Sequence, residues 1–256
     1  MLLLMAVAAG PCHSLTATAD QAAQASDLKV FTTRAIATVL QEIRGDVERT
    51  TGRTLSVTTD VAIRLVRRVR AGEAFDVLVA TPGQLDELIA EGMIIRDTRT
   101  DIARSGIGVA VRRGVTKPDV SSLEAFRRAL VDARSIAYLK EGQSGLYIAG
   151  VLDRLGIADQ IRPKLTLPDT DIVSQLVSRG EVELGIVVIT QILTTDGVSL
   201  AGPLPPEIQS YITFTGGVSV NSQALEAAKD LMRMLQAPAA IGVMRSQGME
   251  PGRSVR

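Results

Sequence analysis

The stretch FDVLVATPGQLDELIAEG, residues 75–92, contains one complete strand–turn–helix unit and decides the fold class. Residues 75–80 are rich in Val and Leu, which is typical of a strand buried on both faces. Thr81 and Gln84 stand three residues apart on either side of Pro-Gly, the spacing of a capping box that opens a helix. Gly92 is a helix terminator, so we expect one helix between the turn and this glycine.

The same alternation of strand and helix recurs along the chain. We expect further strands at residues 28–33, 54–59, 106–111, 135–139, 165–167, 184–189 and 211–220. Between them, apolar residues recur with helical spacing, as in the stripe of Ile36, Val39, Leu40, Ile43 and Val47. Such alternation specifies an α/β fold in which helices cover both faces of a largely parallel sheet.

The predicted organisation is a leader followed by two α/β lobes, the second inserted into the first. Residues 1–26 begin with an apolar run and continue with small residues, which is typical of a secretory leader; the alternative is an alanine-rich disordered tail. The apolar run is too short to span a bilayer, so we expect no stable membrane span and a periplasmic location. Lobe 1 is predicted at 27–108 and again at 209–256, and lobe 2 at 109–208.

Composition excludes several classes of function. The 28 Lys and Arg residues balance 28 Asp and Glu residues, so no net positive charge attracts nucleic acid. The single cysteine and the single histidine, Cys12 and His13, both lie in the N-terminal tail. The folded body therefore lacks the residues for a Cys/His zinc site, a disulfide or a Ser-His-Asp triad. We expect no metal, no cofactor and no conventional catalytic residue.

Several stretches together carry a family resemblance. They are LKVFTTRAIATVLQEI (28–43), GEAFDVLVATPGQLDELIAEGMI (72–94), DIARSGIGVAVRRGVTKPDVSSLEAF (101–126), SIAYLKEGQSGLYIAGVLDRLGI (135–157), LVSRGEVELGIVVITQIL (176–193), GPLPPEIQSY (202–211) and GMEPG (248–252). In this order they resemble periplasmic substrate-binding proteins of the molybdate-binding type, in a branch related to aconitate isomerases. The resemblance implies a two-lobed type II periplasmic binding protein fold with mixed sheets, helices on both faces and a ligand cleft between the lobes. It also implies closure on a small anionic ligand and an ABC permease as partner; we expect a monomer.

A cleft of this kind holds anions with hydroxyls and with backbone N–H groups at helix N-termini. The turn after the first strand supplies Thr32, Thr33 and Arg34, and Arg34 adds a guanidinium suited to a carboxylate. The turn after the second strand supplies Thr59 and Asp60. Each of these places has a simpler interpretation: Thr33 or Asp60 caps a helix and Arg34 points to water.

Two more places complete the predicted ligand site. Gln143, Ser144 and Gly145 open a helix directly after a predicted strand, the context that an anion site needs. Thr190, with Gln191 beside it, ends the apolar strand LGIVVI and is a fourth candidate.

The second of these loops departs from the family pattern. Residues 60–63 read Asp-Val-Ala-Ile where the family has small hydroxyl and glycine residues, and an ionised Asp60 repels an oxyanion. We therefore expect a small organic anion rather than molybdate, bound for an ABC-type importer. The alternative is an aconitate-isomerase-like enzyme that shifts a proton within a small unsaturated tricarboxylate, although no general base stands out. A sensor domain of the same fold is a third possibility.

Overall fold

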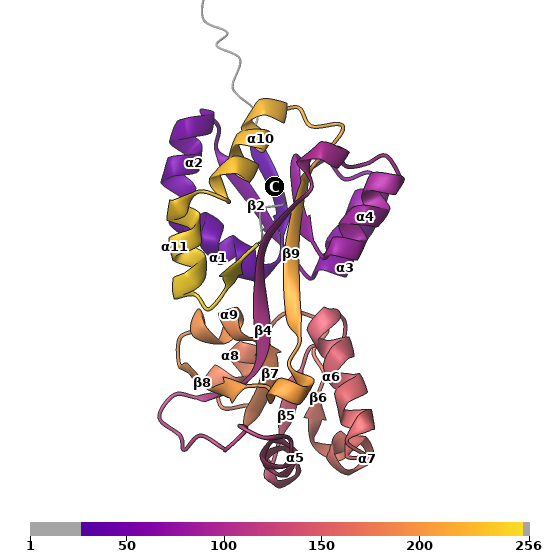
Figure 1. Ribbon diagram of the computed structural model, residues 1–256, viewed down its shortest axis with the longest axis vertical. Helices are drawn as coiled ribbons and strands as arrows, with labels where there is room; N and C mark the ends of the chain where they lie inside the picture. Colours follow the sequence, from indigo (N-terminus) through magenta and orange to yellow (C-terminus); the bar gives the residue numbers. More distant parts are fainter. Residues whose placement is uncertain (1–26, 253–256) are drawn as a thin grey trace, which may run out of the picture.

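The computed structural model describes residues 27–252, in which short apolar runs form a ten-stranded sheet with the order β2-β1-β3-β9-β4-β7-β5-β6. The predicted leader at 1–26 lies outside the described residues. Two further strands, β8 and β10, both pair with β4. Helices cover the sheet, and the molecule divides into an upper and a lower half in Figure 1.

The upper half is built around three parallel strands. They are β1 (Leu28–Thr32), β2 (Leu55–Thr59) and β3 (Val77–Ala80). The antiparallel strand β9 (Tyr211–Val218) pairs with β3 and returns the chain to this half. The helices of this half are α1 (Arg34–Glu42), α2 (Arg44–Thr51), α3 (Ala62–Arg70), α4 (Pro82–Ala90), α10 (Leu225–Met234) and α11 (Pro238–Ser246).

The lower half repeats the same construction. Its strands are β5 (Ile136–Tyr138), β6 (Leu165–Thr166), β7 (Leu184–Val188) and β8 (Val198–Pro203), of which β6 and β7 run parallel to β5. Its helices are α5 (Leu123–Asp132), α6 (Gln143–Arg154), α7 (Ala158–Ile161), α8 (Val173–Ser178) and α9 (Ile189–Leu193). The short strand β10 (Glu250–Pro251) closes the described chain against β4.

Two long strands connect the halves, as Figure 1 shows. The strand β4 (Thr100–Arg112) pairs with β9 up to Gly106 and with β7 and β8 from Ile107 onward. Gly108, just past this change of partners, is closely packed against β8: a Cβ atom there would lie 2.8 Å from Leu200 Cδ1 and 3.1 Å from the carbonyl oxygen of Gly202. A side chain at Gly108 would therefore displace β8.

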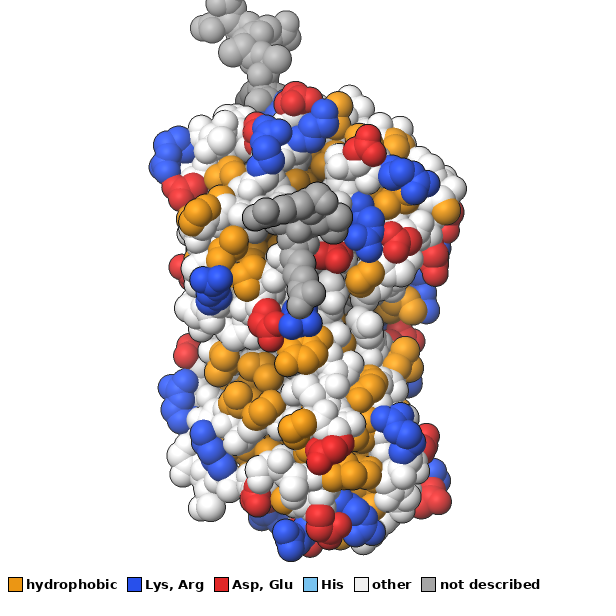
Figure 2. Space-filling view, viewed as in Figure 1, with side chains coloured by type: hydrophobic (Ala, Val, Ile, Leu, Met, Phe, Trp, Pro, Cys, Tyr) orange, Lys and Arg blue, Asp and Glu red, His pale blue; other side chains and the backbone are white. Residues whose placement is uncertain are grey.

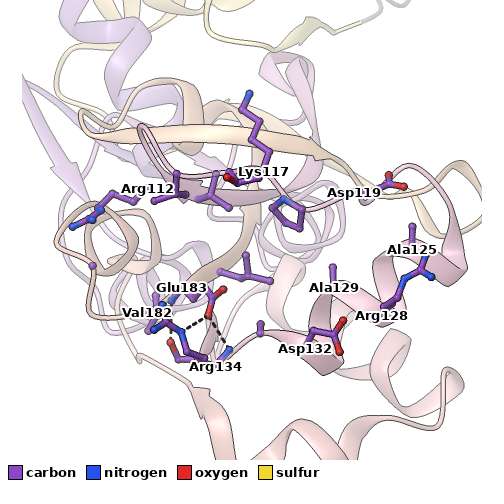
Figure 3. Close-up of a pocket in the computed structure, with 18 residues that line it drawn as sticks. Arg112, Lys117, Asp119, Ala125, Arg128, Ala129, Asp132, Arg134, Val182 and Glu183 are labelled. Atoms are coloured by element: carbon purple, nitrogen blue, oxygen red, sulfur yellow. Dashed lines mark hydrogen bonds and ion pairs between the residues drawn. The ribbon is translucent and has the colours of Figure 1, made fainter.

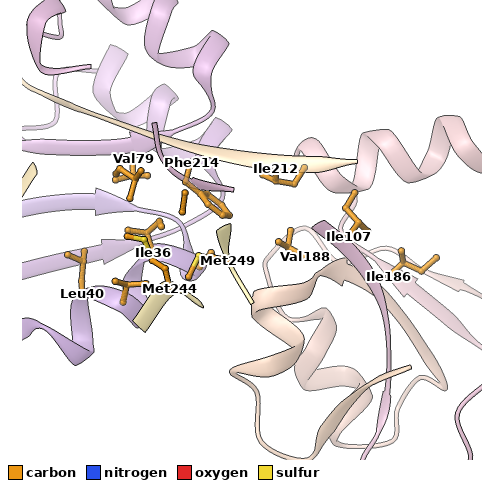
Figure 4. Packing of buried hydrophobic residues seen from close by; sticks show 14 of the residues in the cluster. Ile36, Leu40, Val79, Ile107, Ile186, Val188, Ile212, Phe214, Met244 and Met249 are labelled. Carbon is orange, nitrogen blue, oxygen red and sulfur yellow. The ribbon is translucent and has the colours of Figure 1, made fainter. Parts of the chain in front are cut away.

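The apolar core continues through these connecting strands. In Figure 4, Ile36, Val79 and Phe214 pack together in the upper half, and Ile107 and Val188 lie toward the lower half. Burying one such side chain stabilises the fold by about 1.5–3 kcal/mol, so a continuous cluster ties the two halves together.

The two-lobed α/β fold predicted from the sequence is confirmed. The apolar stripe of residues 36–47 was expected to form one helix, and this is wrong: the chain breaks at Ile43 into α1 and α2. Ile189 was assigned to a strand but begins α9. The lobe boundaries at 27–108, 109–208 and 209–256 stay predictions.

On the face shown in Figure 2, positive and negative side chains are interspersed rather than gathered by sign. Within residues 27–252, no helix is long and apolar enough to cross a membrane.

Candidate functional site

A cleft of about 280 Å³ lies where the two halves of the molecule face each other. Its walls combine upper-half residues, such as Thr81 and Phe214, with lower-half residues, such as Ser144 and Val188. The parallel strands explain this position, because the carboxyl ends of parallel strands meet at one edge of a sheet, where ligands bind in folds of this class.

Five helices begin at this cleft. Their N-cap residues all line it, and they are Thr33 of α1, Val61 of α3, Thr81 of α4, Gly142 of α6 and Val188 of α9. The first backbone N–H groups of a helix have no partner within the helix, and the helix dipole places partial positive charge there. The cleft is therefore a place where anions are stabilised without a lysine or arginine. None of the described residues that line it is a Lys or an Arg.

The structure brings four of the predicted ligand residues to the cleft. Thr33 and Asp60 line it from the upper half, and Gln143 and Ser144 line it from the lower half. Asp60 Oδ1 accepts a hydrogen bond of 2.8 Å from the backbone N–H of Val61, so the carboxylate is held at the start of α3.

The other predicted residues lie beside the cleft rather than in its wall. Thr32 is fully buried and Thr59 is exposed at the end of β2. Thr190 is fully buried, and its backbone N–H donates to Ser105 Oγ at 3.3 Å. Gly145 packs against the backbone, because a Cβ atom there would lie 1.7 Å from the carbonyl oxygen of Leu139. Because Gly145 has no side chain, the start of α6 can lie directly against the backbone of Leu139.

Arg34 makes a contact between the two halves. Its Nη1 atom donates a hydrogen bond of 3.1 Å to the backbone carbonyl oxygen of Asp171 in the segment before α8. The guanidinium therefore bridges α1 to the lower half at the edge of the cleft.

Asp171 is a cleft residue that no sequence pattern predicts. Its Oδ2 atom accepts a hydrogen bond of 2.6 Å from Gln191 Nε2, and both residues line the cleft. Burial raises the pKa of Asp171 to about 6, while the charge of Arg34 acts in the opposite direction. Its position shortly before α8 does not distinguish it from other aspartates that precede a helix.

Thr81 and Gln84 were recognised as a helix cap but not as part of the cleft. Gln84 Oε1 accepts hydrogen bonds from the backbone N–H of Thr81 at 3.2 Å and from its hydroxyl at 2.9 Å. The capping box predicted from the sequence is therefore present. It also presents both side chains to the cleft, which only the assembled fold reveals.

Two of the residues that line the cleft carry buried polar atoms without a hydrogen-bond partner. These atoms are Thr33 Oγ1 and Gln191 Oε1. Gln191 is only 9% exposed. An unsatisfied buried polar group costs about 1–3 kcal/mol, and such groups in a cleft are typical of a site that is completed by a ligand.

A larger cavity of about 720 Å³ lies elsewhere, in the lower half between α5 and the strands β4 and β7. Its cationic residues Arg112, Lys117, Arg128 and Arg134 are accompanied by carboxylates. Arg134 Nε donates to Glu183 Oε2 at 3.1 Å, a pair drawn in Figure 3. None of the unpartnered buried polar atoms of the described chain belongs to its lining. The cleft between the halves is therefore the candidate functional site. Among the described residues, no three His, Cys, Asp or Glu side chains gather to hold a metal ion.

Comparison with known proteins agrees with this geometry. Residues 28–250 match the family described as bacterial extracellular solute-binding protein. Among relatives, the chain is 29% identical over 230 residues to an aconitate isomerase of Pseudomonas sp., covering 88% of this chain and 87% of that protein. It is 21% identical over 252 residues to the molybdate-binding protein ModA of Escherichia coli K12, covering 94% of this chain and 95% of that protein.

Among solved structures, the periplasmic molybdate-binding protein of Azotobacter vinelandii superposes with a TM-score of 0.74 at 18% identity. The match covers 89% of this chain and 100% of that one. At this identity the likeness shows the fold, which is that of periplasmic binding proteins.

Proposed function

This chain belongs to the bacterial extracellular solute-binding protein family, and we propose that its cleft binds a small organic acid anion for delivery to an ABC-type importer. The observation that carries the proposal is the convergence of the N-termini of α1, α3, α4 and α6 on one cleft. Fixed N–H groups and the ends of helix dipoles stabilise a carboxylate there, and closure of the lobes removes it from water.

The carboxylates of the cleft favour an organic ligand over an inorganic oxyanion. Asp60 and Asp171 both line the cleft, and an ionised carboxylate beside a compact dianion such as molybdate or sulfate repels it. An organic acid separates its carboxylates by a carbon skeleton, so part of the ligand is apolar. The cleft has a matching apolar wall, which includes Ile63, Leu139 and Phe214.

The proposed setting is the bacterial periplasm. The family consists of extracellular solute-binding proteins, and the apolar segment at the N-terminus supports export by a signal peptide. The cognate partner would be an ABC permease, as for the relatives that the sequence resembles.

A thermal-shift screen followed by calorimetric titration tests this proposal. Molybdate, tungstate and sulfate form one arm, and small mono-, di- and tricarboxylates form the other. We expect at least one carboxylate to raise the unfolding midpoint, since a ligand present at 100 times its Kd stabilises by about 2.7 kcal/mol. A response to the inorganic oxyanions alone would overturn the organic assignment, and no response in either arm would overturn anion binding.

A second candidate function is a proton shift within an unsaturated carboxylic acid. It is favoured by Asp171, whose pKa of about 6 suits a base that takes a proton from one carbon and returns it to another. Such a step is redox-neutral and needs no oxidant, because the proton taken from one carbon is replaced by a proton on another. The 29% identity to an aconitate isomerase adds support.

The test of this candidate is a proton NMR measurement in D2O with trans-aconitate. Isomerisation, or exchange of the ligand's carbon-bound protons for deuterium, would establish it if the Asp171→Asn variant abolished the effect. Binding without turnover or exchange would leave transport as the function.

A further inference from the structure

We propose that Gln191 acts as an obligatory acceptor in the cleft, so that the site selects an acid bearing a hydroxyl or ammonium group besides its carboxylates. The inference rests on the proposed function and names the substrate class of the same cleft. It is carried by the Asp171–Gln191 contact together with the unpartnered Gln191 Oε1 atom.

The orientation of the Gln191 amide is imposed by its neighbour. Nε2 donates to Asp171 Oδ2 at 2.6 Å, a short distance typical of a hydrogen bond to an ionised carboxylate. The flipped amide would place Oε1 against that carboxylate, with two acceptors in contact and no proton between them. The amide oxygen must therefore face the other way, where it is buried and accepts no hydrogen bond from any described group.

An amide oxygen accepts hydrogen bonds and never donates them. A carboxylate, a molybdate or a sulfate carries no proton at neutral pH and cannot satisfy it. A hydroxyl or an ammonium group on the ligand can. The Asp60 carboxylate, which also lines the cleft, is likewise an acceptor and favours the same ligand groups.

Donors to the ligand come from other parts of the cleft. The N-termini of α1, α3, α4 and α6 present backbone N–H groups, and the hydroxyl of Thr33 has no partner. The site thus divides into a donor part for carboxylates and an acceptor part at Gln191 and Asp60. An acid that bears a hydroxyl or ammonium group can satisfy both parts. Its unsubstituted analogue leaves the acceptor part without a hydrogen-bond donor.

The experiment compares ligands that share one carbon skeleton. Among four-carbon diacids, succinate has no added donor, malate adds a hydroxyl and aspartate adds an ammonium group. Among six-carbon triacids, tricarballylate has no added donor and citrate adds a hydroxyl. Kd values are measured by calorimetry at pH 8, where Asp171 is ionised. We expect at least one donor-bearing acid to bind at least about tenfold more tightly than its unsubstituted analogue, the discrimination of one good hydrogen bond.

Two variants test the role of Gln191 separately. Gln191→Met removes the acceptor and keeps the length of the side chain, and Asp171→Asn removes the ionised neighbour that fixes the amide. Both variants should reduce the ratio of Kd values between the unsubstituted and the donor-bearing acid to less than about threefold, mainly by weakening the binding of the donor-bearing acid. Gln223→Met, on the surface of the upper half, is the matched control and should leave it unchanged.

The outcomes separate this inference from the proposal on which it rests. If every unsubstituted acid binds as tightly as its hydroxyl and ammonium analogues, the acceptor role of Gln191 is wrong and organic-acid binding stands. The same holds if both variants keep the full discrimination. If none of these acids and none of the carboxylates in the thermal-shift screen binds, the proposed organic-acid function itself fails.

Discussion

Single residues decide the chemistry of this cleft, and Asp171 is the most consequential of them. It was missed in the sequence because nothing local distinguishes it from other aspartates that precede a helix. Its importance arises from burial and from Gln191, which lies 20 positions further along the chain. Contacts of this kind depend on the assembled fold.

The raised pKa of Asp171 predicts how stability depends on pH in the ligand-free protein. The folded state holds the proton more tightly than the unfolded state, in which the carboxyl has its ordinary pKa of 3.8. The free energy of unfolding should therefore fall as pH rises from about 3.8 to about 6. At 1.36 kcal/mol per pKa unit, about 2 kcal/mol of stability is lost between pH 4.5 and 7.5.

Asp171→Asn should remove this loss, because the amide does not titrate. Urea denaturation of both proteins at pH 4.5 and 7.5 measures the difference. Asp169→Asn, which changes an exposed carboxyl two residues away, is the control and should leave the Asp171 effect in place. Parallel pH profiles for the wild type and Asp171→Asn would contradict the assignment.

Thr33 should contribute to binding and not to stability. Although it is the N-cap of α1, its hydroxyl caps nothing and has no partner. Thr33→Val should therefore leave the unfolding midpoint unchanged or slightly raised and weaken ligand binding about tenfold, the value of one hydrogen bond.

Thr38 on the same helix provides the opposite case. Its hydroxyl donates to Gln247 Oε1 at 2.7 Å, so Thr38→Val should lower stability without changing the Kd. Calorimetry and thermal unfolding of both variants check the pair. A loss of stability in Thr33→Val with unchanged affinity would show that Thr33 is only a structural cap.

At the scale of secondary structure, the start of α6 depends on glycine. A Cβ atom at Gly145 would overlap the carbonyl oxygen of Leu139, whereas a Cβ atom at Gly150 on the same helix has only the end of the Arg154 side chain nearby, at 3.7 Å. Gly145→Ala should cost about 3 kcal/mol or more and distort the cleft. Gly150→Ala should be neutral or stabilising by up to about 1 kcal/mol, because alanine is the better helix former.

Chemical denaturation of the two variants gives the comparison directly. Equal effects at the two positions would show that the start of α6 is not held against Leu139 as described. Weaker ligand binding is expected from Gly145→Ala alone.

The helices and strands were predicted from the sequence more completely than the residues of the cleft. Strands were recovered because buried strands carry dense Val, Leu and Ile, and the capping box at Thr81 was recovered because its signal is local. The break at Ile43 was missed because apolar residues keep helical spacing across it. Thr33, Asp60, Gln143 and Ser144 were found because each begins a helix after a strand. Gln84 and Asp171 reach the same cleft through packing that no local pattern encodes.

At the scale of the whole molecule, β4 and β9 are the connections around which the halves would move. Arg34 and the carbonyl oxygen of Asp171 form a contact between the halves at the cleft edge. We expect a bound ligand to favour a more closed arrangement, with a smaller radius of gyration in small-angle X-ray scattering. Arg34→Ala should reduce this compaction. An identical radius with and without saturating ligand would contradict closure.

The most direct test of the central claim uses the absence of tryptophan from the chain. Leu146 lines the cleft and is 66% exposed, so Leu146→Trp places a single fluorophore at the proposed site with little effect on the core. Val220→Trp places one at an exposed position outside the cleft lining. Titration with the organic acid that raises the unfolding midpoint most should produce a saturable change in emission from Trp at 146 and none from Trp at 220. A ligand that binds by calorimetry but leaves the emission at 146 unchanged would contradict binding in this cleft.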